Sequence, residues 1–168
     1  MSTRGAVAIK QDDGSWRGVY NRYDSYPTGL GKELFNRLKT SKLKEFAKDL
    51  LRYNTYKGFR EGDLDIGRDY EPITSDNPDP LWVEWVYVID VENEKLEVLT
   101  GKDITTEVED NQKVEDKPIE PDEKPKKIDQ GWHYGHCIFT HEKVAEFDLN
   151  KKRLDWGKLE DKVYNEEV

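Results

Sequence analysis

The chain has 168 residues, of which 38% are charged and 35% hydrophobic, and its 36 acidic and 27 basic residues give a formal net charge of −9. This balance argues against general nucleic-acid binding, which draws its affinity from Lys and Arg at phosphates, so no nucleic-acid partner is expected. The acidity fits a solvated surface, or one that imitates DNA or docks a basic partner. No apolar stretch approaches the ~20 residues of a membrane span, and the N-terminus lacks an export signal. Cys137 is the single cysteine, which excludes an internal disulfide. We therefore expect one cytoplasmic domain over residues 1–168, without a membrane partner.

The first predicted elements are a hairpin and two helices. Residues 5–9 and 16–20 have the composition of strands and flank an Asp-Gly turn. Apolar residues then recur every four positions over 30–38, which predicts a helix with Thr28 as its cap. A second helix is expected over 40–51, with an apolar face formed by Leu43, Phe46, Ala47, Leu50 and Leu51.

The middle of the chain combines a long irregular loop with its strongest strand. Residues 57–80 lose periodicity and carry three Gly and three Pro, so this loop is either functional or disordered. Residues 82–91 alternate and are also apolar on the second face, which predicts a central strand covered on both sides. A polar turn over 92–95 leads into a strand over 96–99 and completes a second hairpin.

The C-terminal part offers a third hairpin and an insertion. The spacing of residues 90–98 is repeated over 148–156, which favours an equivalent strand-turn-strand unit. Between these segments, residues 103–130 carry ten acids, five lysines and three prolines, and we expect a mobile acidic insertion. A strand is expected over 131–140 and a terminal helix through Leu159 and Val163. The prediction is an α+β fold: a single domain with an antiparallel sheet of about three hairpins and two short helices packed on it.

A cluster of His133, His136, Cys137 and His141 suggests a metal site at first sight. In one extended strand His133 and Cys137 would share a face and His136 would lie on the other, so four ligands cannot converge. No metal or other cofactor is therefore expected. A lone Cys with apolar neighbours is typically buried and inert, which disfavours a Cys–His nucleophile.

Residues 21–31 form the candidate site. Two tyrosines, an Arg, an Asp and a helix start bracketed by glycines lie within eleven residues. A helix N-terminus offers free N–H groups, although the lysine and hydroxyl of a phosphate-binding loop are absent. The candidate ligand-binding residues are Arg22, Tyr23, Asp24, Tyr26, Gly29 and Gly31. The alternative is that Pro27, Gly29 and Gly31 only turn the chain and Asp24 caps it.

The N-terminus suggests a second chemistry. Removal of Met1 would expose Ser2 as a nucleophile that carries its own base. Ser2-Thr3, the hairpin and Asn21-Arg22-Tyr23-Asp24 resemble the opening of the choloylglycine and penicillin-acylase hydrolases, which begin with Cys-Thr and carry an Arg-Asn-x-Asp segment. The resemblance implies that Arg22 and Asp24 would orient the substrate and the amine. Ser in place of Cys, the inverted Asn-Arg order and the short chain depart from that pattern.

The first forty residues also resemble a group of small uncharacterised proteins from bacteria and their phages. Those proteins open with Ser-Thr-Arg and carry an aromatic-Asp-Gly-Tyr-Pro-x-Gly-x-Gly segment before a helix. The matching positions here are Ser2-Thr3-Arg4, Asp13-Gly14, Tyr20 and residues 23–31, with Ser25 in place of Gly and Asn21-Arg22 in place of Cys-His. The resemblance implies no activity.

Three functions follow in order. The first is a non-catalytic binding protein of bacterial or phage origin that holds a small polar ligand or peptide at residues 21–31. The alternative is an N-terminal amidohydrolase that uses Ser2. The third is an acidic mimic or inhibitor of a host protein, with residues 103–130 as the docking arm.

Overall fold

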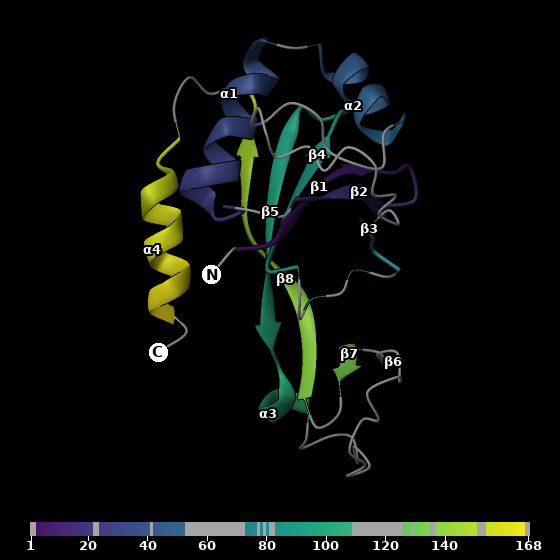
Figure 1. Cartoon of the computed structure of the whole chain (residues 1–168), viewed down its shortest axis with the longest axis vertical. Helices are drawn as coiled ribbons and strands as arrows, with labels where there is room; N and C mark the ends of the chain where they lie inside the picture. The colour runs from purple at the N-terminus through teal and green to yellow at the C-terminus, as the bar shows by residue number, and fades with distance from the viewer. Residues whose placement is uncertain are drawn as a thin grey trace.

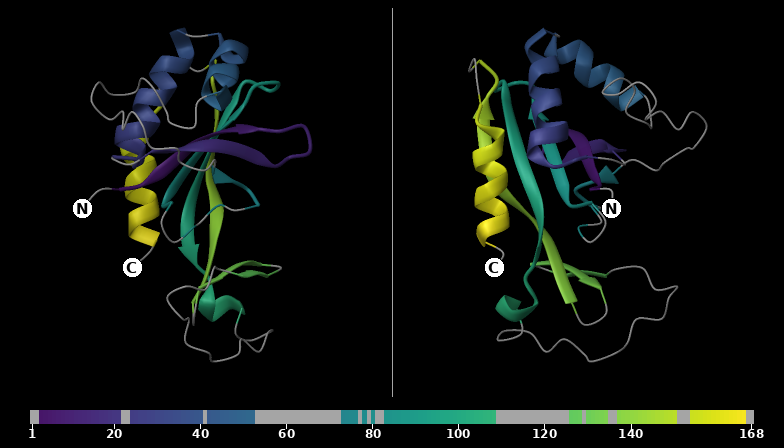
Figure 2. Two further views of the ribbon diagram at one scale, coloured as in Figure 1. Left: turned by 45° about the vertical axis from the view of Figure 1, so that its right-hand side comes forward. Right: turned by 60° about the vertical axis from the view of Figure 1, so that its left-hand side comes forward.

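The computed structural model describes residues 3–21, 24–40, 42–52, 73–76, 78, 80, 83–108, 126–128, 130–134, 137–150 and 154–166. These residues form one curled sheet of eight strands with the longer helices against one of its faces (Figures 1 and 2). The strands are β1 (Gly5–Lys10), β2 (Trp16–Asn21), β3 (Ile73–Thr74), β4 (Trp85–Asp90), β5 (Lys95–Asp103), β6 (Lys126–Ile128), β7 (Gly131–Tyr134) and β8 (Cys137–Asp148). Their order across the sheet is β3-β2-β1-β4-β5-β8-β7-β6.

The helices are short, and most of them follow the first hairpin. One turn of π-helix, η1 (Pro27–Gly31), continues directly into α1 (Lys32–Thr40), and α2 (Leu43–Arg52) follows. A single turn, α3 (Thr105–Val108), follows β5, and α4 (Trp156–Glu166) ends the described chain. In Figure 1, α1 and α2 lie at one end of the molecule beside the β4–β5 turn, whereas α3, β6 and β7 lie at the opposite end.

The sheet buries apolar side chains on both faces. The helix-covered face holds the larger cluster, in which Trp85, Tyr87 and Ile89 of β4 meet the leucines of α1 and Trp156 of α4. The opposite face holds a smaller cluster made by Ala6, Ala8, Val86 and Val88. Because β1 and β4 contribute to both clusters, they form the centre of the sheet, as the apolar character of both faces of residues 82–91 predicts.

The predicted sheet was wrong in its topology. Every neighbouring pair is antiparallel except β1 and β4, which run parallel with Gly5 opposite Trp85 and Ile9 opposite Ile89. The chain leaves β2, passes through α1 and α2 and adds β3 beside β2 before β4 enters the sheet beside β1, and the two central strands point the same way. The result is a mixed, curled sheet, and strands dominate the fold over the few short helices. The expected antiparallel sheet of three hairpins does not form.

Two of the three predicted hairpins are confirmed and the third is wrong. β1 pairs with β2 across the Asp13-Gly14 turn, and β4 pairs with β5. After β8, however, the chain enters helix α4 at Trp156. Trp156, Leu159 and Val163 are all buried in the helix-covered cluster, and this spacing of three and four residues is the helical stripe that the repeated pattern of 148–156 conceals.

The strand predicted over residues 131–140 is two strands. β7 ends at Tyr134 and β8 begins at Cys137, and the two pair antiparallel with Tyr134 opposite Cys137. His133 lies opposite Ile138, so it shares a face with that residue, and Cys137 belongs to the other face. The assumption that His133 and Cys137 share a face was therefore wrong, because it treated a hairpin as one extended strand.

The two irregular segments lie largely outside the described residues. Within residues 57–80 the structure describes β3, Ser75, Asp76, Pro78 and Pro80. Residues 109–125 of the acidic segment are also outside, whereas its two ends contribute the last residue of β5, the turn α3 and strand β6. The predicted mobility of the insertion therefore stays a prediction for 109–125.

Candidate functional site

The described part of the 21–31 segment folds inward around Ser25. The Ser25 side chain has no exposed surface, and its Oγ accepts a 2.8 Å hydrogen bond from Asn21 Nδ2. The Ser25 carbonyl accepts a 2.6 Å bond from the buried Tyr87 hydroxyl, and its N–H donates to the Thr3 carbonyl at 3.1 Å. These bonds tie the segment to the first strand and to the centre of the sheet.

The glycines of this segment are explained by close packing. A Cβ on Gly29 would lie 2.4 Å from the Asp24 carbonyl oxygen, and one on Gly31 would lie 2.9 Å from the Trp156 ring. Asp24 adopts a left-handed conformation with φ of 52°, and its carbonyl accepts a bond from Leu30 N–H at 2.9 Å. The Tyr26 carbonyl likewise accepts from Gly29 N–H at 3.0 Å. The four described candidate residues therefore have internal structural roles.

The remaining candidates of both sequence hypotheses lie outside the described residues. Arg22 and Tyr23 complete the predicted ligand site, and Ser2 is the nucleophile of the alternative hydrolase. Thr28, expected to cap the helix, lies inside η1, and Tyr26 takes the N-cap position, where its side chain makes no capping hydrogen bond. A ligand site at residues 21–31 and a reactive Ser2 therefore stay predictions.

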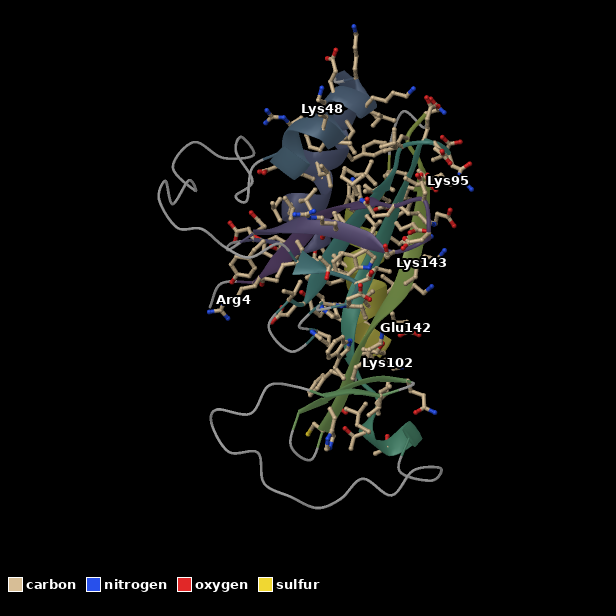
Figure 3. The ribbon with its side chains drawn as sticks, turned by 90° about the vertical axis from the view of Figure 1, so that its right-hand side faces the viewer. Arg4, Lys48, Lys95, Lys102, Glu142 and Lys143 are labelled. Carbon is tan, nitrogen blue, oxygen red and sulfur yellow. The ribbon has the colours of Figure 1, made fainter. Side chains whose placement is uncertain are left out.

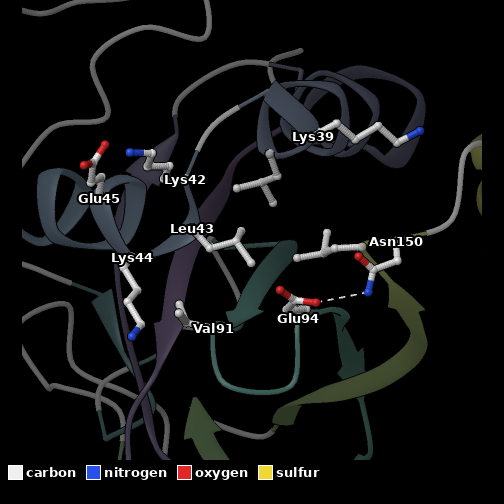
Figure 4. A pocket seen from close by; sticks show the side chains of 10 residues that line it. Lys39, Lys42, Leu43, Lys44, Glu45, Val91, Glu94 and Asn150 are labelled. Carbon is white, nitrogen blue, oxygen red and sulfur yellow. Dashed lines mark hydrogen bonds between the residues drawn. The ribbon is translucent and has the colours of Figure 1, made fainter.

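The cavity that we call the basic cleft lies elsewhere, between the α1–α2 corner, the β4–β5 turn and the end of β8 (Figure 4). Its volume is about 810 Å³, and it is lined by Leu38, Lys39, Lys42, Leu43, Lys44, Glu45, Val91, Glu94, Leu149 and Asn150. Four of these residues are aliphatic, and all four are buried in the helix-covered cluster or packed against it. The cleft is thus an opening at the edge of the main core, with a charged rim.

Three ammonium groups dominate that rim, and they are differently engaged. Lys39 Nζ lies 4.3 Å from the centre of the Phe35 ring, in a cation–π contact. Lys42 and Lys44 are exposed, and neither forms an ion pair with another residue of the described chain. Opposite them, the Glu94 carboxylate accepts a 3.1 Å bond from Asn150 Nδ2.

Sequence reasoning missed this cleft because its residues come from three distant segments. One signal was available. The Lys32–Arg52 stretch that becomes α1 and α2 carries seven Lys and Arg against three Asp and Glu, so it is basic within a chain of net charge −9. Such a local reversal of charge marks a surface of different electrostatic character.

A second hollow of about 690 Å³ adjoins η1 and is lined by Thr28, Lys32, Phe35, Asn36, Leu154, Asp155, Trp156 and Gly157. Asp155 Oδ1 accepts a 3.0 Å bond from Lys158 N–H, and Thr28 N–H donates to Glu160 Oε2 at 3.3 Å. The Phe35 and Trp156 rings meet edge to face with centres 6.0 Å apart. These contacts join α4 to η1 and α1, so the hollow is the seam between packed helices.

A cluster of charged side chains lies on the face of the sheet opposite the helices, near the β4–β5 turn (Figure 3). Lys10 Nζ lies 3.2 Å from Glu97 Oε1 and 3.9 Å from Asp90 Oδ2, and Lys143 Nζ lies 3.5 Å from Glu97 Oε1. Burial by itself would raise the pKa of Asp90, but hydrogen bonds from Asn93 and the charges of Lys10 and Lys95 outweigh it, and the pKa is lowered. The cluster is paired internally and is a structural feature of the sheet.

The described histidines, His133 and His141, belong to no candidate metal cluster among the described residues. No group of three or more His, Cys, Asp and Glu side chains suited to a metal occurs among the described residues, which exclude His136. His141 Nε2 lies 2.7 Å from the Val83 carbonyl oxygen, and the His141 ring meets Trp16 edge to face. The environment of His141 is thus set by packing.

Comparison with known proteins finds no matching family model, no matching curated protein and no matching solved structure. None of the helices in the described segments is both long and apolar enough to cross a membrane. The functional argument therefore rests on the geometry of this chain.

Proposed function

We propose that this protein binds a small ligand without transforming it, and that the basic cleft holds the ligand. The carrying observation is a hollow of about 810 Å³ whose aliphatic lining is continuous with the main core. Ligand sites in proteins are typically concave, of about 300–1,000 Å³, and apolar with a few polar groups at fixed positions. Leu38, Leu43, Val91 and Leu149 supply the apolar lining here, and Asn150 and the rim charges supply the polar groups.

The cleft is favoured over residues 21–31 because two of its lining residues, Lys42 and Lys44, form no ion pair with another residue of the described chain. In the 21–31 segment, the backbone of Asp24 and Tyr26 and the space above Gly29 and Gly31 are already occupied by the protein itself. In the cleft, Lys42 and Lys44 project from the start of α2, and Figure 4 shows the Lys44 side chain extending toward Val91. The contacts therefore best support a binding role whose site is the basic cleft and not residues 21–31.

Titration with the neutral apolar dye N-phenylnaphthylamine tests the proposal. We expect saturable fluorescence enhancement with the wild-type protein and a loss of at least about fivefold in affinity in Leu149→Ser, which removes apolar lining worth roughly 1–2 kcal/mol. Leu154→Ser is the matched control, because Leu154 is also half-buried against the main core but lines the seam beside α4. Thermal denaturation of both variants reports folding. Equal dye affinity in the two variants would contradict the proposal.

A further inference from the structure

The basic cleft combines two chemistries that a single ligand must satisfy. Its interior is aliphatic, through Leu38, Leu43, Val91 and Leu149, and each of these side chains also packs in or against the main core. Its rim carries three lysines and two glutamates. A purely polar ligand would leave the aliphatic wall wet, and a purely apolar ligand would leave the rim charges without a partner.

The rim is basic in effect as well as in count. The Glu94 carboxylate is engaged by Asn150 at 3.1 Å, and the Lys39 ammonium lies over the Phe35 ring at 4.3 Å. Lys42 and Lys44 have no ion-pair partner among the described residues, and Glu45, the other acid of the rim, is exposed on α2. The rim therefore carries two ammonium groups without an ion pair in the described chain and one exposed carboxylate, and Figure 4 shows the Lys42 and Glu45 side chains near each other.

The positive charge near the cleft contrasts with the negative charge of the rest of the chain. The chain has a net charge of −9, although its Lys32–Arg52 stretch carries seven basic and three acidic residues. The chain outside that stretch is correspondingly more acidic and repels anions over distances within the Debye length of about 8 Å at physiological salt. Among the described elements, α1 and α2 thus offer an anion a surface where the charge is reversed.

Resting on the proposed function, we infer that the ligand of the basic cleft is a small amphipathic anion, with an apolar body and one carboxylate, phosphate or sulfonate group. The apolar body lies against Leu43, Val91 and Leu149. The anionic group lies at the rim that Lys42 and Lys44 line, where a flexible Lys side chain supplies a point charge that tolerates several anion geometries. Charge complementarity at the rim selects this class over neutral and cationic amphiphiles.

A pair of dyes that differ by one charge separates the two parts of the inference. Anilinonaphthalene sulfonate has the body of N-phenylnaphthylamine and one added sulfonate. We expect the sulfonate dye to bind the wild-type protein more tightly than the neutral dye, and its affinity to fall as salt rises. Lys42→Gln combined with Lys44→Gln should weaken the sulfonate dye about tenfold and leave the neutral dye unchanged.

Lys48→Gln is the charge control, because Lys48 is exposed on the same helix and does not line the cleft. If both dyes lose affinity in Leu149→Ser but the two lysine substitutions leave the sulfonate dye unchanged, the cleft binds ligands and the anionic class is wrong. If Leu149→Ser affects neither dye, the proposed function itself fails. A Lys48→Gln effect as large as that of the cleft lysines would reduce the charge effect to general attraction and overturn the inference.

Discussion

At the scale of single residues, the fold depends on a polar contact inside the main core. The Tyr87 hydroxyl is the donor to the Ser25 carbonyl at 2.6 Å, and Tyr87 has no exposed surface. Burial, assisted by the charge of Glu160 and by Tyr164, raises the pKa of Tyr87 well above its ordinary value. The hydroxyl therefore stays protonated and keeps the 21–31 segment attached to the sheet.

Replacing Tyr87 with Phe should lower the free energy of unfolding by about 1–3 kcal/mol, because a buried carbonyl loses its donor while the ring volume is kept. Urea denaturation followed by circular dichroism measures this change. Wild-type stability in Tyr87→Phe would show that the Ser25 carbonyl finds another donor and that the segment is held by packing alone.

Residue-scale chemistry was only partly readable from the sequence. The density of Asn21, Asp24, Tyr26, Gly29 and Gly31 correctly marked a segment with special requirements. The sequence could not show that the requirement is internal, because the partner Tyr87 lies 62 residues from Ser25 along the chain. The alternative that the glycines turn the chain and let it pack closely agrees with the described contacts.

At the scale of elements, local patterns predicted well and non-local ones did not. The Asp13-Gly14 turn, where Gly14 has φ of 88° and Ser15 N–H donates to Asp13 Oδ1 at 3.0 Å, is a hairpin signal contained in a few residues. β1 pairs with β4, which lies some eighty positions away along the chain, and no local sequence pattern encodes that pairing. The sequence around Trp156 fitted both a strand and a helix start, and packing against Phe147 and Phe35 selected the helix.

The long strand β8 presents an open edge that its own sequence protects. β7 pairs only with residues 137–139 of β8, so the edge beyond Phe139 has no strand partner among the described residues on the side away from β5. The register against β5 shifts so that Val144 has no residue opposite it, and Glu142, Lys143 and Glu146 are exposed along the same stretch. Bulges and charges of this kind are the usual means by which edge strands avoid pairing with another chain.

Replacing Glu142, Lys143 and Glu146 together with Thr should therefore promote self-association, seen as faster, concentration-dependent sedimentation. The ion pairs lost are half-exposed and contribute little to folding, about 0–1 kcal/mol each. The control removes the same charges elsewhere, through Glu92→Gln, Asp161→Asn and Lys162→Gln. Similar sedimentation of the two triple variants would mean that net charge, and not the strand edge, governs association.

At the scale of the whole molecule, charged residues are distributed unevenly, which the amino-acid composition alone does not show. Figure 3 shows lysines at several heights of the sheet face, and charged side chains of this surface form ion pairs, such as Lys102 with Glu142 at 3.7 Å and Lys95 with Glu146 at 3.4 Å. At the rim of the basic cleft, Lys42 and Lys44 form no ion pair with another residue of the described chain. The solvated acidic surface stays a prediction, and the basic cleft is the surface that we assign to a ligand.

Acid should destabilise the protein partly through Asp90. Its pKa in the folded state lies below the ordinary value of 3.8, so its ionised form stabilises the fold above that pH and the contribution is lost as pH falls through the folded-state pKa. Asp90→Asn should therefore show a shallower loss of stability than the wild type between about pH 5 and pH 2, measured by urea unfolding at each pH. Asp12→Asn, an exposed turn substitution with the same charge change, should retain the wild-type slope; identical slopes in all three proteins would exclude Asp90 as a contributor.

The parallel pairing of β1 with β4 also bears on the order in which the sheet forms. On one side of it, β1 and β2 are joined by a short turn; on the other, β4, β5 and β8 are antiparallel neighbours in chain order. Each half can begin to form from nearby contacts, but the two halves meet only after the long crossover through α1 and α2 has closed. Closure of such a non-local pair is the slow kind of step in folding. We therefore expect the β1–β4 pair to form late in folding, and a partly folded form that lacks it would expose the inner edges of β1 and β4 to other molecules.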